Sequence, residues 1–214
     1  MPVHRISHPV FARFYAQVSP AMDAGGMAAR RRQLLQGLTG TVIEIGAGNG
    51  LNFAHYPAGV TQVLAVEPDP FLRQIASRNA ASAPVPIEVT DGIAEDLPAG
   101  DTTFDAAVAT LVLCTVASQQ AALREIHRVL PPGGQLRFLE HVRAGTAGLR
   151  RLQRLLDAAI WPALNGGCHT GRDTAAAVQA AGFTIERLDR FRFPEMRLTL
   201  PASPHLSAIA SRAL

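Results

Sequence analysis

The sequence predicts an α/β fold built on a doubly wound, mostly parallel sheet of seven strands. Short apolar segments of strand length alternate with longer segments of helical periodicity along residues 39–214. This alternation is typical of a parallel sheet with helices on both faces. The apolar segment 41–46 also runs directly into a glycine-rich turn, as strands do where a nucleotide-type ligand binds. We expect one globular unit over 39–214.

The preceding residues, 1–38, are expected to form helices that cap the pocket of this unit. Residues 8–18 place four apolar side chains at helical spacing on one face: Phe11, Phe14, Tyr15 and Val18. These side chains either pack on the core or close over a substrate. A second helix is expected over 22–38, before the first strand.

Strands and helices then follow in order. Strands are expected over 41–46, 61–66, 85–89, 104–113, 135–141 and 183–192, with 205–213 as the seventh. Helices are expected between the glycine turn and Pro57, and over 71–80, 119–130, 149–160 and 172–181. The almost wholly apolar segment 104–113 suits a central parallel strand. The run Pro131-Pro132-Gly133-Gly134 indicates a sharp stop between a helix and the next strand.

Charge and composition describe an ordinary globular chain. The 214 residues are 48% hydrophobic and 17% charged, as is usual for a folded domain. The sequence pI is near 9.5, and all 20 Lys+Arg residues are arginines. However, the densest clusters, 30–32 and 150–154, contain no interleaved aromatic residues that could stack on bases. We therefore expect solvated helix faces and no nucleic-acid partner.

The two cysteines, Cys114 and Cys168, are too few for a disulfide framework or a metal site. We expect free thiols in a reducing cytoplasm, no bound metal, and a packing role for Cys168. The N-terminal residues lack the apolar stretch of a signal peptide. The longest apolar segment, 106–117, is shorter than the roughly 20 residues of a membrane helix. The expectation is a cytoplasmic protein with no integral membrane segment, and a homodimer is one assembly to test.

The glycine-rich turn carries the pattern Glu-x-Gly-x-Gly-x-Gly over residues 44–50. Glycine accepts positive φ at little cost, so such a turn lets the backbone pass close to a ligand. A dinucleotide-binding loop would read G-x-G-x-x-G. In this sequence the position of the third glycine is occupied by Leu51. An acid at Glu67 suits a dinucleotide equally well, so an NAD(P)-dependent oxidoreductase stays open as an alternative. A glycine turn without any ligand is the other reading.

The pattern of residues 44–50 resembles the first motif of class I methyltransferases, which bind S-adenosyl-L-methionine (SAM). Residues 130–134, LPPGG, resemble the L-x-P-G-G motif of the same proteins. The segments HPVFARFY, LVLCTV, LRFLEHVRA, GGCH and PASPHLSAIA are similar to one subgroup. That subgroup contains bacterial methyltransferases labelled as lipid or quinone type, and animal thiol methyltransferases.

This resemblance implies a Rossmann-like sheet and SAM-dependent methylation of a small hydrophobic or aromatic acceptor. A thiol acceptor is slightly favoured. N- or C-methylation of an indole or amine in specialised metabolism is the first alternative, followed by methylation of a quinone or phospholipid. A non-catalytic SAM-binding protein is the alternative from another class.

The cofactor residues are expected where the parallel strands end, because ligands of open α/β sheets bind beyond the carboxyl ends of the strands. We expect Glu44 to anchor the methionine end indirectly, Glu67 to accept from the ribose hydroxyls, and Asp91 to accept from the adenine amine. The full expected set is Glu44, Gly46, Ala47, Gly48, Gly50, Asn52, Glu67, Pro68, Asp91, Gly92, Ile93, Thr110 and Leu111.

Two histidines are the expected catalytic residues. His141 ends the strand 135–141, and His169 lies on the glycine-rich loop 165–171. Imidazole can take up a proton near neutral pH, although His141 could equally serve only to bond the backbone. The residues expected to contact the acceptor are Phe11, Phe14, Tyr15, His141, Trp161 and His169. If these aromatic side chains converge, the pocket suits a small apolar molecule.

Overall fold

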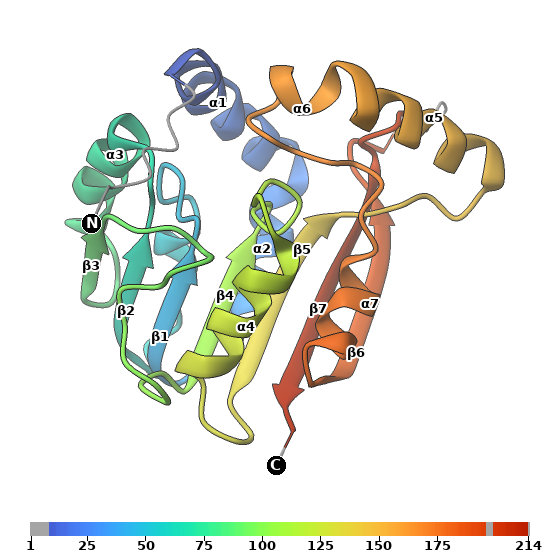
Figure 1. Cartoon of the computed structure of the whole chain (residues 1–214). Coiled ribbons are helices and arrows are strands. Elements are labelled where there is room, and N and C mark those ends of the chain that lie inside the picture. Colours follow the sequence, from blue (N-terminus) through green and yellow to red (C-terminus); the bar gives the residue numbers. More distant parts are fainter. Residues whose placement is uncertain (1–8, 196–198, 214) are drawn as a thin grey trace.

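A seven-stranded sheet forms the centre of the computed structural model, in the order β3-β2-β1-β4-β5-β7-β6 (Figure 1). The structure describes residues 9–195 and 199–213. The strands are β1 (Gly40–Ile45), β2 (Val60–Val66), β3 (Ile87–Thr90), β4 (Ala106–Thr110), β5 (Gln135–His141), β6 (Phe183–Arg192) and β7 (Pro204–Arg212). Only β7 pairs antiparallel with its neighbours β5 and β6. The predicted mostly parallel, seven-stranded fold is confirmed.

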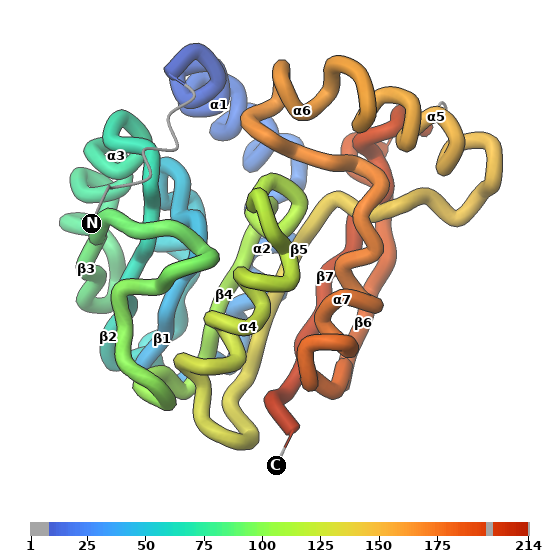
Figure 2. Tube along the Cα trace, viewed as in Figure 1, coloured from blue at the N-terminus to red at the C-terminus, as the bar shows by residue number. Residues whose placement is uncertain are grey.

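Helices cover both faces of this sheet, and some of them also lie beyond one end of its strands. They are α1 (Pro9–Met22), the π-helical turn η1 (Asp23–Met27), α2 (Ala28–Leu35), the 3-10 turn η2 (Phe53–His55), α3 (Pro70–Ala80), α4 (Gln119–Val129), α5 (Ala147–Ala159), α6 (Trp161–Leu164) and α7 (Thr174–Ala180). The Cα trace shows α1, α5 and α6 beyond the carboxyl ends of the parallel strands (Figure 2). These three helices therefore lie where a ligand of such a sheet would bind.

The central strand β1 shows why the sheet needs two helical layers. Val42 and Ile43 are both fully buried, and their side chains point to opposite faces. Val42 packs in the cluster that contains Leu35 of α2, while Ile43 packs in the cluster that contains Ile126 of α4. A strand buried on both faces reads as a continuous apolar run, as the sequence does here.

Some element boundaries differ from the sequence prediction. The predicted helix after the glycine turn is only the 3-10 turn η2. The predicted strand 104–113 ends at Thr110, because Leu111 takes a positive φ of 58° and turns the chain out of the sheet. The predicted helix 22–38 is interrupted within η1, where Gly26 has a φ of 123°.

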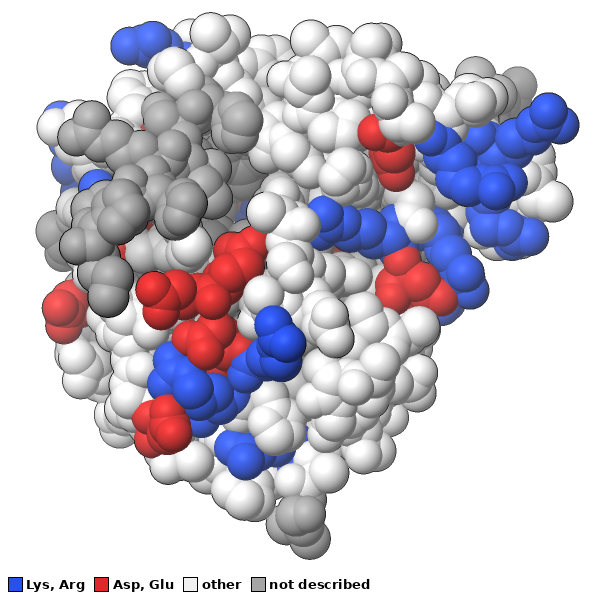
Figure 3. Space-filling model, in the orientation of Figure 1, with Lys and Arg blue, Asp and Glu red and all other residues white. Residues whose placement is uncertain are grey.

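The arginine cluster of α5 lies on the surface. Arg151 and Arg154 are exposed, and Figure 3 shows basic side chains gathered over this helix. The solvated face predicted for residues 150–154 agrees with this position. The same prediction for residues 30–32 is wrong at Arg31, which is buried and pairs with Asp23 at 2.9 Å. Across the residues described, no helix combines the length and apolar character needed to cross a membrane.

Candidate active site

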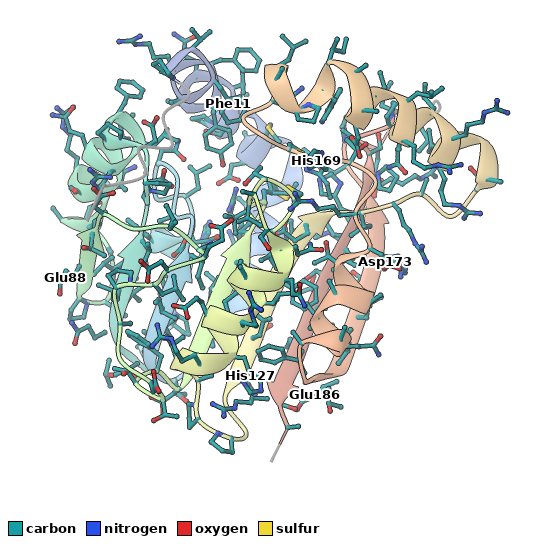
Figure 4. The ribbon with its side chains drawn as sticks, in the orientation of Figure 1. Phe11, Glu88, His127, His169, Asp173 and Glu186 are labelled. Atoms are coloured by element: carbon teal, nitrogen blue, oxygen red, sulfur yellow. The ribbon has the colours of Figure 1, made fainter. Side chains whose placement is uncertain are left out.

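Two adjoining cavities of about 150 and 330 Å³ lie beyond the carboxyl ends of β1, β2 and β4. We call the pair the cleft. Five residues line both cavities: Gly46, Pro68, Val112, Thr115 and Gly166. Together the two volumes reach the size range of small-molecule sites. Phe11 borders the smaller cavity from α1, and His169 borders the larger one from the loop before α7 (Figure 4).

The glycine loop forms the floor of the cleft and requires its glycines for two reasons. Gly46, Gly48 and Gly50 have positive φ values of 63°, 59° and 81°, which side chains rarely tolerate. A Cβ at Gly46 would also lie 2.3 Å from Cγ2 of Val112. A side chain at Gly46 would therefore both strain the backbone and displace Val112.

Glu67 presents a buried carboxylate to the cleft at the end of β2. The N–H of Gly48 donates to its Oε2 at 2.7 Å, and the N–H of Asp69 donates to its Oε1 at 2.9 Å. Burial raises the pKa of Glu67 to about 7, against the lowering effect of these two donors. Each oxygen keeps a further lone pair, so the carboxylate can accept hydrogen bonds from a pair of hydroxyl groups.

Glu44 lies behind the glycine loop and does not line the cleft. Its Oε2 accepts from the hydroxyl of Tyr56 at 2.7 Å, and its Oε1 accepts from Nδ2 of Asn52 at 2.9 Å. Asn52 also donates to Oγ1 of Thr110 at 3.1 Å, and Thr110 borders the cleft. Burial raises the pKa of Glu44 to about 7. The arrangement gives Glu44 the position expected of an indirect anchor. The sequence analysis did not assign Tyr56 to this anchor, because no spacing pattern links it to Glu44.

The adenine side of the expected site is only partly assembled. Gly92 and Ile93 line the larger cavity. The carboxylate of Asp91 instead accepts from Nη1 of Arg73 at 2.9 Å, with 54% of its side chain exposed. Asp91 is therefore not among the residues that line the cleft.

Most of the expected cofactor residues line the cleft: Gly46, Gly48, Glu67, Pro68, Gly92, Ile93, Thr110 and Leu111. The others surround it: Glu44, Ala47, Gly50, Asn52 and Asp91. The carboxyl ends of the parallel strands meet at one edge of the sheet, which brings these residues together.

The expected acceptor residues divide between different places. Phe11 and Tyr15 line the smaller cavity and stack at a ring separation of 5.9 Å. Burial raises the pKa of Tyr15, so its hydroxyl stays protonated. Phe14, on the same helix, is 55% exposed and is not part of the cleft lining. Trp161 is half-buried and also lies outside that lining.

His141 lies in different surroundings from His169. It borders a separate cavity of about 510 Å³, together with Phe193 and His205. Its Nδ1 is 3.7 Å from Sγ of Cys114 and 3.6 Å from Sγ of Cys168. A hydrogen bond between the two thiols and, after it, the imidazole of His141 lower the pKa of Cys168 against the raising effect of burial. The expectation that Cys168 serves only in packing missed this cluster.

Comparisons with known proteins identify the class to which this fold and cleft belong. A sequence model described as a methyltransferase domain matches residues 43–138. Among solved structures, an S-adenosylmethionine-dependent methyltransferase from Mesorhizobium loti is similar with a TM-score of 0.65 and 22% identity. The similarity extends over 89% of this chain and 100% of the Mesorhizobium loti chain. The [4+2]-cyclase SpnF is similar with a TM-score of 0.70 and 19% identity, covering 95% of both chains.

Relatives of known activity are more similar in sequence. Thiol S-methyltransferase TMT1B of Mus musculus is 36% identical over 193 residues, which covers 84% of this chain and 77% of the relative. Thiol S-methyltransferase TMT1A of Homo sapiens is 35% identical over 182 residues, covering 78% of this chain and 73% of the relative. Demethylmenaquinone methyltransferase of Mycobacterium tuberculosis is 48% identical, but over only 61 residues.

The protein is a methyltransferase of the Rossmann-like, SAM-dependent class, and SAM is its cofactor. It belongs to the family that contains the mammalian thiol S-methyltransferases. The residues present fit this cofactor, because a positive-φ turn leaves backbone at the cleft and a buried carboxylate there keeps free lone pairs. The predicted enzyme class and cofactor are confirmed.

Proposed function

We propose that the protein methylates the sulfur of a small apolar thiol. The single observation that carries this proposal is the sequence identity with thiol S-methyltransferases over most of the chain. The cleft supports it, because Phe11, Leu111 and Val112 give it a largely apolar wall. A thiol is a weak hydrogen-bonding group, so it can enter such a wall without the desolvation cost of an alcohol or amine.

We infer that the strand ends hold the cofactor as the sequence suggested. Glu67 would accept from the ribose hydroxyls, Gly92 and Ile93 would flank the adenine, and the turn at Gly46 to Gly50 would contact the methionine portion. Ala47, Asn52, Pro68, Thr110 and Leu111 complete this proposed contact set. Asp91 is paired with Arg73 through Oδ1, so its Oδ2 would be the oxygen that accepts from the adenine amine. When bound, SAM supplies an electrophilic methyl group on its sulfonium.

The chain's own residues would then orient the thiol and remove its proton. His169 borders the larger cavity, and its backbone N–H donates to the carbonyl of Cys114 at 2.8 Å, which fixes this part of its loop. We propose that its imidazole takes the thiol proton as the carbon–sulfur bond forms, giving a methyl thioether and S-adenosylhomocysteine. We do not place His141 in this step, because it lines a different cavity.

We also propose that residues 1–38 act as a cap over the catalytic unit 39–214. In the described part of this segment, Ser19 accepts from Nδ2 of Asn49 at 3.0 Å, and a Cβ built on Gly48 would lie 3.4 Å from Cε1 of Tyr15. Closing this helix over the loop would exclude water from the reaction. The cytoplasmic location, the homodimer and the lack of a nucleic-acid partner stay predictions.

Replacing Glu67 with glutamine should weaken S-adenosylhomocysteine binding about tenfold or more, because hydrogen bonds to a charged acceptor contribute roughly 1.5–3 kcal/mol. The same carboxylate predicts a pH dependence. With a pKa of about 7 in the free protein, Glu67 must lose a proton before it accepts fully. The affinity of the wild type for S-adenosylhomocysteine should therefore fall about tenfold as the pH is lowered from 8 to 6.

Calorimetric titration over this pH range measures both effects. Glu67→Gln should give a flat profile, and Glu88→Gln, at an exposed position of β3 (Figure 4), should keep the wild-type profile. If Glu67→Gln retains both the wild-type affinity and its dependence on pH, Glu67 does not bind the ribose.

Replacing His169 with glutamine should lower kcat for thiol methylation by roughly 10²-fold or more, the usual contribution of a positioned general base. The loss should shrink as pH rises and more of the thiol ionises in solution. Binding of S-adenosylhomocysteine should stay within about twofold of wild type. Steady-state rates from pH 6 to 9 test this, and an equal loss at every pH would contradict a role in proton removal.

An acceptor panel tests the proposed function itself. The protein is incubated with methyl-labelled SAM and matched pairs of small aryl and alkyl thiols, alcohols, amines and indoles, and products are identified by mass spectrometry. Methyl thioethers should form at least tenfold faster than any other product. Faster methylation of the amine or indole would favour the N- or C-methyltransferase alternative, and cofactor binding without any product would indicate a non-catalytic role.

A further inference from the structure

Three side chains with metal-binding atoms meet behind the cleft, although they come from separate parts of the chain. Cys114 lies in the loop after β4, His141 ends β5, and Cys168 lies in the loop before α7. The cysteines are 54 residues apart in sequence, and each is 27 residues from the histidine. All three ligand atoms lie within 4.8 Å of one another.

The distances within this cluster match those between the ligands of a tetrahedral zinc ion. The sulfurs are 3.7 Å apart, and they lie 3.7 and 3.6 Å from Nδ1 of His141. Zinc–sulfur bonds of about 2.3 Å and zinc–nitrogen bonds of about 2.0 Å give tetrahedral edges of about 3.8 Å and about 3.5 Å respectively. An ion could therefore contact all three atoms with very little movement of the protein.

The backbone around both cysteines is held in place by other groups. The buried carboxylate of Glu140 accepts from the N–H groups of Val112, Leu113 and Cys114 at 3.0, 2.9 and 3.1 Å. The carbonyl of Cys114 accepts from the N–H of His169, the residue after Cys168. These bonds fix the two loops against each other, as preorganised ligands require.

We propose that Cys114, Cys168 and His141 bind one zinc ion as three of its four ligands. Binding would release the protons of both thiols, and two thiolates with a neutral imidazole would balance the charge of the ion. That neutrality matters, because Cys114 is 1% exposed and Cys168 is 6% exposed. The fourth ligand would be water, since three protein ligands leave one tetrahedral position open.

The sequence analysis predicted no metal site because two cysteines without a short spacing carry no such signal. The proposed site does not depend on the methyl acceptor or on His169. It would join the loops 111–118 and 165–171, and both loops supply residues of the cleft wall. Zinc would therefore stabilise the wall from behind.

Metal analysis of the full-length protein tests the proposal. The chain is produced with added zinc, purified under reducing conditions and analysed by elemental mass spectrometry, where one zinc per chain is expected. After chelation, titration with Co²⁺ should give thiolate-to-cobalt charge transfer in the near ultraviolet and the intense visible bands of a tetrahedral ion. Adding zinc to the chelated protein should raise its thermal unfolding midpoint.

Cys114→Ser and Cys168→Ser should each lose stoichiometric zinc and the charge-transfer band. His127→Gln is the matched control, because His127 lies on α4 against Phe183, away from the cluster. The wild-type cobalt spectrum decides the matter even if a cysteine variant fails to fold. A reduced wild type that binds neither metal, a Cys114–Cys168 disulfide under these conditions, or full zinc retention in both serine variants would overturn the proposal.

Discussion

Replacing Gly46 with alanine is expected to lower the free energy of unfolding by about 2–5 kcal/mol and to weaken S-adenosylhomocysteine binding at least tenfold. A positive φ costs a residue with a Cβ roughly 1–2 kcal/mol. Overpacking adds roughly 1–3 kcal/mol, because the new atom would lie 2.3 Å from Cγ2 and 2.8 Å from Cβ of Val112. Either Val112 or the glycine loop must move, and both form the cleft.

Gly37→Ala is the matched control for this substitution. Gly37 also has a positive φ, of 78°, but a Cβ there would meet nothing within 4 Å. It should show only the conformational cost, about 1–2 kcal/mol, and unchanged cofactor affinity. Urea unfolding and calorimetry measure both quantities. Equal losses of stability and affinity in the two variants would contradict the claim that close contact with Val112 shapes the loop.

Replacing Glu140 with alanine is expected to destabilise the protein by about 3–5 kcal/mol, because three backbone N–H groups would lose one shared acceptor. The structure places these groups at Val112, Leu113 and Cys114. Unfolding midpoints should fall by roughly 2–4 °C for each kcal/mol lost. Cofactor affinity should also fall, since Val112 lines both cavities of the cleft.

Glu140→Gln and Glu88→Ala separate this effect from a simple loss of charge. The glutamine keeps one acceptor oxygen and should recover part of the stability. Glu88 is exposed on β3, so its substitution should change the free energy of unfolding by no more than about 0.5 kcal/mol. If Glu140→Ala were as stable as Glu88→Ala, the carboxylate would not be holding this loop.

Much of the fold and of the cofactor site could be predicted because both follow from local patterns. Apolar runs of strand length marked the parallel strands, and the glycine spacing of residues 44–50 marked a turn with positive φ. The carboxyl ends of parallel strands meet at one edge of the sheet, so Glu67 and Gly92 could be placed near that turn without any coordinates.

The two neighbouring residues Glu140 and His141 show what such patterns leave open. Successive side chains of a strand point to opposite faces, so these two side chains should have different surroundings. The sequence does not say which side chain meets which groups. The structure turns Glu140 toward the backbone of that loop and places His141 against the thiols and His205. The prediction that His141 and His169 share one pocket depended on the orientation of His141.

The cluster of Cys114, Cys168 and His141 was beyond reach for a related reason. Metal-ligand spacings are recognisable in sequence when the ligands share one loop or helix face. Here three elements bring one residue each, and only the packed fold makes them neighbours.

Hydrogen–deuterium exchange with and without S-adenosylhomocysteine tests most directly whether the cleft is the cofactor site. We predict slower exchange in the segments 46–50, 67–69, 91–93 and 110–112, and in residues 11–19 of α1 as the helix closes over the loop. Exchange near Phe193 and His205 should change little. Protection confined to the cavity beside His141, with none at the glycine loop, would contradict the account.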